Sequence, residues 1–250
     1  GLAQDHAPRE RIPPHHHDSD QLIYASVGVI TVETEDGIWV VPPARAVWVP
    51  AGVTHSILMS GRVALRSIYL DPALAPIEGT HCCVVQVSPL LRSAILRAME
   101  FSQPYPESGR EARLVDVILD EIQVAEVAPL HLPVPDDPRA RRVALAFRDD
   151  PADRRSRAEW ARVGGTSERT LERLFHAGVG TSFGKWQRQA RLLAALERLA
   201  AGESVTGAAF DVGFQTPSAF ITMFRRAMGT TPARYFGEAQ RVPDAGTSSG

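Results

Sequence analysis

The strongest constraint on the fold is an arrangement of turn residues and apolar residues near the C-terminal end of the chain. A short helix is predicted over 205–212, and Thr216 followed by Pro217 predicts the N-cap and first residue of the next helix. Phe220 and Phe224 fall on the inner face of that helix. Its outer face is small and polar with one cation, which suits insertion into a groove. These outward residues are Ser218, Ala219, Thr222 and Arg225.

A second copy of this arrangement lies upstream. Residues 158–163 predict a short helix, a Gly-Gly-Thr turn follows, and Ser167 predicts the N-cap of a helix over 167–177. A helix predicted over 183–201 joins the copies, and at about 1.5 Å per residue it would be roughly 28 Å long. Successive major grooves on one face of DNA lie about 34 Å apart. Such a rod could hold two recognition helices, over 167–177 and 216–228, in adjacent grooves.

Residues 139–238 resemble the C-terminal domain of the AraC/XylS family of bacterial transcription regulators. The matching residues are Arg191-Leu192 in the connecting helix, Gly213-Phe214, Phe220, Phe224 and Gly229-Thr230-Thr231-Pro232. One helix-turn-helix pattern alone is common in helical bundles that never touch DNA, whereas two copies at this spacing are rare by chance. The resemblance implies a DNA-binding half that consists only of helices.

The exposed faces of the two recognition helices supply the expected DNA contacts. Helix-turn-helix proteins place the N-terminal side chains of the second helix against base edges. Arginine can bind guanine, glutamate can accept from cytosine, and small side chains can meet a thymine methyl group. Contacts to phosphate position the protein without specifying sequence. We expect base contacts from Arg169, Glu172, Arg173, Pro217, Ser218, Ala219 and Thr222, and phosphate contacts from Lys185, Arg188 and Arg225.

The charge of the chain is unevenly divided. Its formal net charge of −2 would by itself argue against a nucleic-acid partner. However, residues 1–135 carry 9 basic and 16 acidic side chains, whereas residues 136–250 carry 18 basic and 13 acidic ones. The basic half contains the paired motif, as contact with phosphates requires.

The first ninety residues predict β-structure, because short runs rich in Val, Ile, Tyr and Trp follow one another with prolines only at their margins. Asp36-Gly37 predicts a tight hairpin, and Ser60-Gly61 a second one. No helical pattern alternates with the runs, so we expect a small barrel or jelly roll over 1–88. The expected strands cover 22–35, 38–41, 46–49, 56–59 and 62–70.

A sharper pattern lies inside this region. His15-His16-His17 precedes Gln21, and Pro50-Ala51-Gly52-Val53-Thr54-His55 follows. These residues resemble the two motifs of the cupin fold, HxHxxxE and PxGxxH, whose enzymes hold a divalent metal inside the barrel. Gln21 departs from the usual carboxylate, which disfavours iron and manganese and leaves zinc or nickel, held by three imidazoles. The ligands that the resemblance implies are His15, His17, Gln21 and His55.

Two other interpretations of these histidines stay open. The cavity could bind a small-molecule effector without a metal, with His17, Trp48 and His55 in its lining, or the histidines could be purely structural. Cys82 and Cys83 are adjacent, and we expect them to be reduced and partly buried in a strand, with a redox sensor as the alternative.

Two amphipathic helices are predicted between the barrel and the DNA-binding half, over 89–101 and 110–128. They either pack on the barrel or form a homodimer seam, as is frequent in this family. Residues 129–138 contain four prolines and predict a linker. The tail over 239–250 is small and polar, and we expect it to be disordered.

These patterns predict an α+β protein of two domains: an N-terminal cupin-like β-barrel with helices, and a C-terminal all-α double helix-turn-helix over 139–238. We expect a sequence-specific, non-enzymatic transcription regulator, either activator or repressor, controlled by a small-molecule or metal effector. Its expected partners are double-stranded DNA, the effector and, for an activator, RNA polymerase. The chain shows neither a signal peptide nor an apolar run of about 20 residues, so a cytoplasmic protein is expected.

Two other classes of protein would share parts of these patterns. A cupin enzyme with an accessory helical domain would need an ionised ligand set, which Gln21 disfavours. An architectural DNA-binding protein without an effector would show little sequence preference and a strong dependence on salt.

Overall fold

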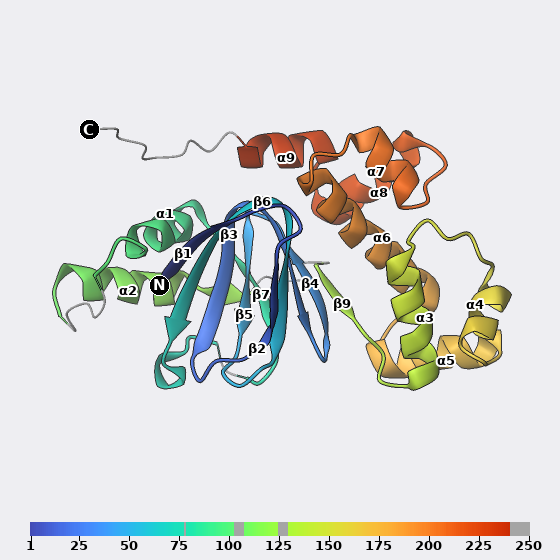
Figure 1. Cartoon of the computed structure of the whole chain (residues 1–250), viewed down its shortest axis with the longest axis horizontal. Coiled ribbons are helices and arrows are strands. Elements are labelled where there is room, and N and C mark those ends of the chain that lie inside the picture. Colours follow the sequence, from blue (N-terminus) through green and yellow to red (C-terminus); the bar gives the residue numbers. More distant parts are fainter. Residues whose placement is uncertain (78, 103–107, 125–129, 241–250) are drawn as a thin grey trace.

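Strands gather in the first half of the chain and most helices in the second, as the predicted α+β organisation requires. The computed structural model describes residues 1–77, 79–102, 108–124 and 130–240. Within them, the strands form one bent sheet, α1 (Pro89–Ala98) and α2 (Arg110–Glu121) lie at its outer end, and most of the other helices form a second body at its opposite end, from which α9 (Pro232–Gln240) extends back above the sheet (Figure 1). The predicted fold class is confirmed.

Two long strands connect all parts of the antiparallel sheet. The first half of β3 (Asp20–Thr34) pairs with the second half of β6 (His55–Leu70), and the second half of β3 pairs with the first half of β6. The remaining strands are β1 (Leu2–His6), β2 (Arg11–His15), β4 (Gly37–Val41), β5 (Arg45–Val49), β7 (Cys83–Gln86), β8 (Gln123–Val124) and β9 (His131–Pro133). Their order is β1-β6-β3-β5-β7-β8, with β2 paired to β6, and with β4 paired to β3 and β9.

Both long strands bend at a glycine. Gly28 in β3 and Gly61 in β6 have φ angles of +81° and +76°, and the β3–β6 register shifts between residues 25 and 29. A Cβ on Gly28 would lie 2.3 Å from the carbonyl oxygen of Arg62, so a larger residue cannot fit without a backbone shift. The bend lets one pair of strands contribute to both halves of the barrel.

One of the two predicted hairpins is confirmed and the other is wrong. The hairpin at Asp36-Gly37 is confirmed, since it joins β3 to β4. The hairpin predicted at Ser60-Gly61 is wrong, because both residues lie inside the single strand β6, where Gly61 forms part of a bulge. Strands β1 and β2 were not predicted; both pair with β6 and are mostly exposed, so they lack the apolar alternation of an inner strand.

Two helices cover the outer face of the sheet. In α1 (Pro89–Ala98), the N-cap Ser88 accepts a hydrogen bond from the backbone N of Leu91, and α2 (Arg110–Glu121) packs on α1. Both helices are shorter than predicted, and residues 103–107 and 125–129 lie outside the described residues. The apolar side chains that α1 and α2 bury join a cluster with the outer face of β3 and β5, so these helices pack on the barrel.

The expected linker contributes a strand to the barrel. Residues 131–133 form β9, which pairs with β4. The indole Nε1 of Trp186 donates to the carbonyl oxygen of Pro133 at 2.8 Å, and the Gln189 amide donates to the carbonyl oxygen of His131. The proline content predicted a linker, but it did not show that both the sheet and a distant helix supply hydrogen-bond partners for this segment.

The second body contains the paired motif. A cluster of aromatic rings from Phe147, Trp160, Phe175, Phe183 and Trp186 fills its centre. None of the helices in the described ranges is long and apolar enough to span a membrane. The helices are α3 (Pro138–Asp149), α4 (Arg157–Val163), α5 (Glu168–Val179), α6 (Phe183–Ala200), α7 (Val205–Asp211), α8 (Pro217–Met228) and α9 (Pro232–Gln240).

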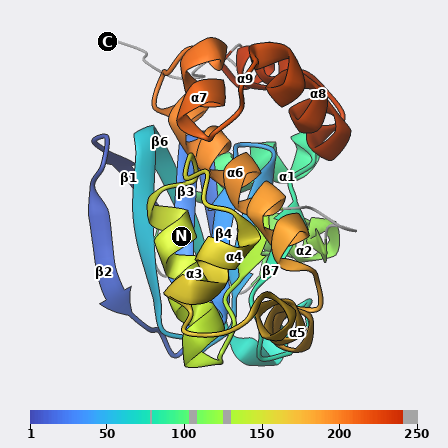
Figure 2. The same ribbon diagram turned by 90° about the vertical axis from the view of Figure 1, so that its right-hand side faces the viewer.

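The long helix α6 lies against the barrel. It contacts β3, β4, β6 and β9, and it crosses this side of the sheet in Figure 2. The hydroxyl of Thr31 donates to the carboxylate of Glu197 on α6, and burial raises the pKa of that carboxyl above its usual range. Glu33 forms ion pairs with Arg11 on β2 and with Arg148 on α3. The barrel and the helical body therefore share both a polar contact and a continuous hydrophobic cluster.

Candidate functional site

The helix predicted as the first recognition helix, α5, is fixed at both ends by its own sequence. Ser167 caps it by accepting from the backbone N of Thr170 at 3.3 Å, and Gly180 ends it in the left-handed conformation. Its inner side chains are buried in the helical body, whereas Arg169 and Arg173 are exposed four residues apart. Among the described residues neither arginine has an acidic partner, so both guanidinium groups are available to DNA.

Glu172 has a different environment from the one expected. Its carboxylate accepts a hydrogen bond from the backbone N of Phe183, the first residue of α6, at 3.1 Å. It also pairs with Arg157 on α4 at 3.4 Å. In this structure the Glu172 side chain therefore ties α5 to α4 and α6, and its expected contact to a base stays a prediction.

The helix predicted as the second recognition helix, α8, begins as predicted. Thr216 accepts from the backbone N of Ala219 at 3.3 Å, and Pro217 occupies the first turn. Phe220 and Phe224 are buried. The side chains of Ser218, Ala219, Thr222 and Arg225 are exposed, and Pro217 is partly exposed. Two residues that the sequence analysis left out share this exposed end and face: Gln215, next to the N-cap, and Arg226.

The connecting helix α6 holds these two helices apart. It has 18 residues, which at about 1.5 Å each makes it roughly 27 Å long. Lys185 and Arg188 are exposed one turn apart near its start. Arg191 instead donates to the carbonyl oxygens of Pro151 and Asp153 and lies over the Phe147 ring, so it fixes α6 to the end of α3. Figure 1 places α5 near the start of α6 and α8 near its end.

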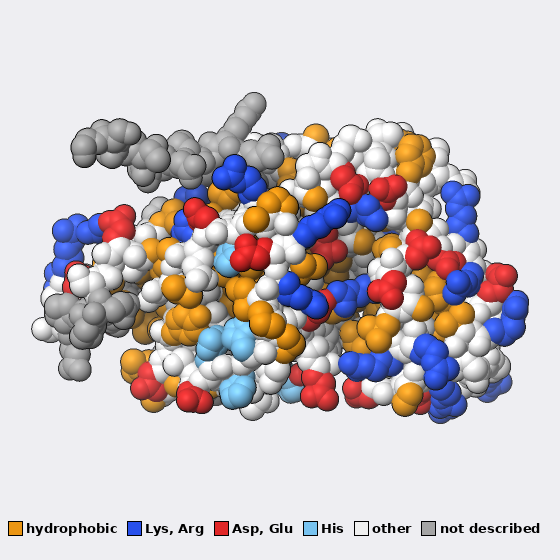
Figure 3. Space-filling model, viewed as in Figure 1, with side chains coloured by type: hydrophobic (Ala, Val, Ile, Leu, Met, Phe, Trp, Pro, Cys, Tyr) orange, Lys and Arg blue, Asp and Glu red, His pale blue; other side chains and the backbone are white. Residues whose placement is uncertain are grey.

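Basic side chains are frequent on the helical body. On the face shown in Figure 3, many of the Lys and Arg side chains lie over this part of the molecule, interspersed with acidic ones. Histidine side chains gather on the same face near the lower edge of the sheet. Two candidate sites thus lie in different halves of the molecule.

The histidine centre is formed by His15 at the end of β2, His17 just after it, and His55 at the start of β6. One ligand atom from each lies within 4.8 Å of the others, and the ring centroids are 4.3–5.6 Å apart. Strand pairing positions them, since His15 is directly opposite His55 in the β2–β6 ladder. The loop before His55 is held by the Gly52 backbone N, which donates to the His17 carbonyl oxygen at 2.8 Å.

The tautomers of two rings are set by backbone oxygens. The Nδ1 atoms of His15 and His55 lie 2.8 Å and 2.9 Å from the carbonyl oxygens of Pro13 and Val53. A carbonyl only accepts, so each Nδ1 carries the proton and each Nε2 keeps a lone pair. The Nε2 atoms of His17 and His55 are buried and have no partner among the described residues. Buried lone pairs without a donor are what a cation would satisfy.

Burial favours the neutral form of His17 and of His55. It lowers the pKa of His55 to about 4 and also lowers that of His17, to which the neighbouring His15 and His16 contribute. Neutral imidazole is the form that binds a metal. In a tetrahedral zinc site, nitrogens about 2.0–2.1 Å from the metal are about 3.3 Å apart, so ligand atoms that now lie up to 4.8 Å apart would need to approach by up to roughly 1.5 Å.

Gln21 lies beside this centre with its amide oriented. Its Nε2 donates to the Ser67 hydroxyl and to the Tyr69 hydroxyl, at 3.2 Å each, and its Oε1 is buried without a described partner. The Tyr69 ring in turn contacts the His17 ring, with centroids 5.0 Å apart. Tyr69 thus links Gln21 to the histidine centre, and three imidazoles with an amide oxygen would form a neutral ligand set that fits zinc or nickel better than iron or manganese.

Trp48 does not join the histidines. Residues along β5 alternate between the two faces: Val47 and Val49 pack inside the barrel, whereas Trp48 packs outside with Leu22 and Leu91. The expected cavity with His17, Trp48 and His55 in one lining is therefore contradicted, because the strand period of two points Trp48 toward α1.

The cysteines lie where they were expected. Cys83 begins β7 and Cys82 precedes it, both free and partly buried. Burial raises the pKa of both thiols, that of Cys82 to about 12. A thiol held in this state forms little of the thiolate that redox chemistry requires.

Replacing His131 by Phe is expected to make the protein less sensitive to acid. The ring stacks on Trp39 at 4.3 Å, its Nε2 is buried without a described partner, and burial lowers its pKa to about 4. The folded state favours the neutral form of His131. Its contribution to the free energy of unfolding is therefore complete above pH 6.5 and is lost as the pH falls toward 4. Wild type should lose at most about 3 kcal/mol more stability than H131F over this range.

The measurement is urea unfolding of both proteins with chelator at pH 7 and pH 4.5. Phe keeps the stacked ring, and the raised pKa of Glu197 affects both proteins equally. Equal losses of stability in the two proteins would contradict the assignment to His131.

Comparisons with known proteins identify both halves separately. Residues 2–114 match the family model of an AraC-like ligand binding domain, and residues 160–238 match that of a helix-turn-helix domain. The chain is 35% identical over 230 residues to the HTH-type transcriptional regulator NimR of Escherichia coli strain K12, covering 92% of this chain and 84% of that protein. It is 38% identical over 103 residues to the HTH-type transcriptional regulator RipA of Corynebacterium glutamicum, covering 41% of this chain and 31% of that protein.

Similar solved structures cover the whole chain or its helical half. ToxT from Vibrio cholerae aligns over 94% of this chain and 97% of its own, at 11% identity and a TM-score of 0.42. The DNA-binding domain of AdpA, solved with a target DNA, aligns over 44% of this chain and 100% of its own, at 28% identity and a TM-score of 0.41.

Proposed function

The chain belongs to the AraC family of helix-turn-helix transcription regulators, and we propose that it binds an asymmetric DNA site with α5 and α8 in successive major grooves, under control of a divalent metal at the histidine centre. DNA binding and a ligand-binding domain are properties of the family. The placing of two helices and the nature of the effector are our proposals.

The observation that carries the DNA-binding proposal is the rigid link between two capped helices. Both α5 and α8 begin at a side-chain N-cap, bury their apolar face in one core and expose the opposite face. The connecting helix α6 is roughly 27 Å long, which is comparable to the spacing of about 34 Å between successive major grooves. The two helices therefore act as one unit, in which Arg169 and Arg173 contact one groove and Ser218, Ala219 and Thr222 the next.

Selection of sheared genomic DNA by the purified protein, followed by footprinting, tests this proposal. The expected result is a defined site that spans about two turns of the helix, with different sequences in its two halves, because the two recognition helices differ. Retention of any DNA, lost with modest salt, would contradict it, since that behaviour belongs to an architectural protein.

The metal proposal rests on the donor set. His15, His17 and His55 would hold the ion through imidazole nitrogens, and the oriented Gln21 oxygen would be a neutral fourth ligand. Zinc or nickel bound there would supply a fixed positive charge that holds β2, β6 and the loop before His55 together. With the Gln21 oxygen as fourth ligand, all four positions of a tetrahedral zinc would be filled by the protein, as in structural sites, whereas catalytic sites keep one position open for water.

A short structural path links the centre to the DNA-binding half. His55 is directly opposite Thr34 in the β3–β6 ladder, and Glu33, the residue before Thr34, pairs with Arg148 on α3. Glu33 also pairs with Arg11 on β2, the strand that ends at His15. A metal that draws His15 and His55 together would therefore act on β2, which contacts Glu33 through Arg11, and on β6, which pairs with β3 beside Glu33. Such a differential contact is what an effector needs in order to shift the arrangement of two domains.

Replacing His55 by Ala is expected to lower zinc and nickel affinity by at least about a hundredfold, because a ligand contributes no less than the residues that orient it. Isothermal titration with each chloride salt measures this affinity. The matched control is His16→Ala, which removes an exposed neighbouring imidazole outside the cluster. Equal affinities in H55A and H16A, both with wild-type unfolding midpoints, would contradict the metal site.

A further inference from the structure

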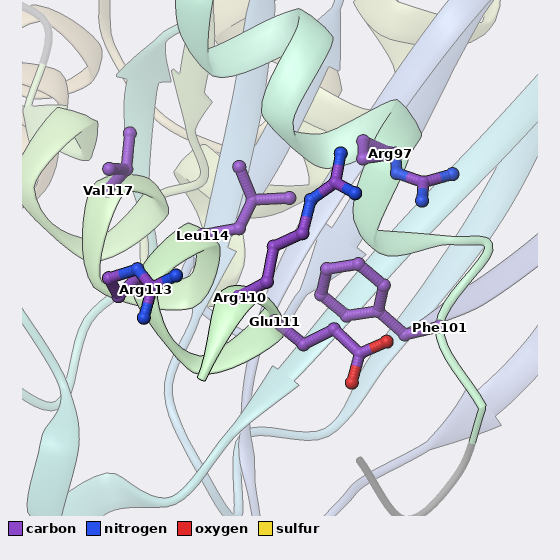
Figure 4. Close-up of a pocket in the computed structure, with 7 residues that line it drawn as sticks. All are labelled: Arg97, Phe101, Arg110, Glu111, Arg113, Leu114 and Val117. Atoms are coloured by element: carbon purple, nitrogen blue, oxygen red, sulfur yellow. The ribbon is translucent and has the colours of Figure 1, made fainter. Parts of the chain in front are cut away.

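A second pocket lies outside the barrel, between α1 and α2. Its volume is about 340 Å³, within the range of small-ligand sites. Figure 4 shows its seven lining residues: Arg97, Phe101, Arg110, Glu111, Arg113, Leu114 and Val117. We propose that this pocket binds a small organic anion with an apolar body, at a site separate from the histidine centre.

The charge of the pocket is positive. Three guanidinium groups line it against one carboxylate, that of Glu111. The Arg110 side chain reaches from α2 toward α1 and Arg97 (Figure 4). Arg97 pairs with Glu100, whereas Arg110 and Arg113 have no acidic partner within the ranges that the structure describes. Like charges that face one pocket repel each other, and a bound anion would relieve this repulsion.

The other side of the pocket is apolar. Phe101 and Leu114 are partly buried, and Val117 is among the exposed large hydrophobic residues at 36%. Phe101 also lines a neighbouring cavity of about 40 Å³, together with Ile68, Leu70 and Ile118. The apolar wall therefore extends from the arginines toward the outer face of the sheet. An occupant needs a carboxylate or sulfonate group at one end and a hydrocarbon body at the other.

The site is independent of the barrel interior. The side chains beneath α1 and α2, such as Leu22 and Trp48, belong to the outer cluster. Gln21 points to the opposite face of β3 from Leu22, and the three histidines lie on β2, just after it and on β6. Loss of metal binding and loss of anion binding can therefore be separated by experiment, and one proposal can fail without the other.

Phenylbutyrate and its uncharged amide are suitable probes, measured by isothermal titration against the full chain. We expect one phenylbutyrate per chain, at least tenfold weaker binding to Arg110→Gln and to Arg97→Gln, and at least tenfold weaker binding of the amide to wild type. Arg66→Gln is the control, since Arg66 pairs with Asp5 on β1 and lies outside this pocket. H55A should bind phenylbutyrate like wild type.

Three results would overturn the proposal: no saturable binding to wild type, equal binding of the amide, or affinity unchanged in both arginine variants that retain wild-type unfolding midpoints. Sedimentation identifies the competing occupant. A wild-type dimer that Val117→Glu dissociates, with no phenylbutyrate bound to either protein, would assign this surface to a second copy of the chain.

Discussion

Replacing Arg169 and Arg173 together by Ala is expected to weaken binding to the selected DNA site by roughly 2–6 kcal/mol. Each arginine that contacts a guanine in two places contributes about 1–3 kcal/mol of discrimination. Both side chains are exposed on α5 and are not engaged by an acid within the described chain. The preference for particular bases should be lost in one half of the site only, because α8 is untouched.

Quantitative gel-shift titration on the selected site and on variants with single base changes measures both effects. Arg113→Ala is the control for the loss of a surface cation, since Arg113 lies on α2, away from the helical body. A loss of the same size on every DNA sequence would contradict the prediction and would make the two arginines phosphate contacts.

Replacing Gly61 by Ala is expected to disturb the contact between the barrel and α6, and with it the effect of metal on DNA binding. A Cβ at this position would lie 2.3 Å from the carbonyl oxygen of Ala200, and the φ of +76° is itself costly for any other residue. We expect a stability loss of roughly 2–5 kcal/mol from the combined strain and overlap. The free energy that couples two binding sites is typically about 1–3 kcal/mol. In G61A, the coupling between metal binding and DNA binding should fall toward zero.

Gly202→Ala is the matched control. It lies two residues after Ala200 with a φ of +92°, and nothing lies within 4 Å of its Cβ position. It therefore carries the conformational cost without the overlap. DNA affinity measured with and without zinc gives the coupling in each variant. If zinc changed the DNA affinity of G61A as much as that of G202A, the contact between Gly61 and α6 could not carry the coupling between the two sites.

Features set by neighbouring residues could be predicted from the sequence. The N-caps Ser167 and Thr216 each depend on a few adjacent residues, and the helices that they begin agree closely with prediction. The three histidines could also be grouped, because their motif spacing matched a known fold and strand pairing brings them together.

Features set by distant residues could not be predicted. Glu172 stands on the outward stripe of its helix, and only the position of the α6 start, eleven residues away, shows that its carboxylate is engaged. Ser60-Gly61 has the composition of a turn, yet the ladder with β3 makes it a bulge. Only the register of β5 against β3 shows on which face of the sheet Trp48 lies. In each case the deciding partner is remote in sequence.

The central claim is that α5 and α8 bind DNA as one rigid unit, and the most direct test alters the DNA between them. Insertion of about five base pairs, half a helical turn, between the two halves of the selected site turns the second groove to the opposite side. We expect the affinity of wild type to fall to the level of a site that keeps only one half. Unchanged affinity after this insertion would contradict the claim, because a rigid α6 cannot follow a rotated groove.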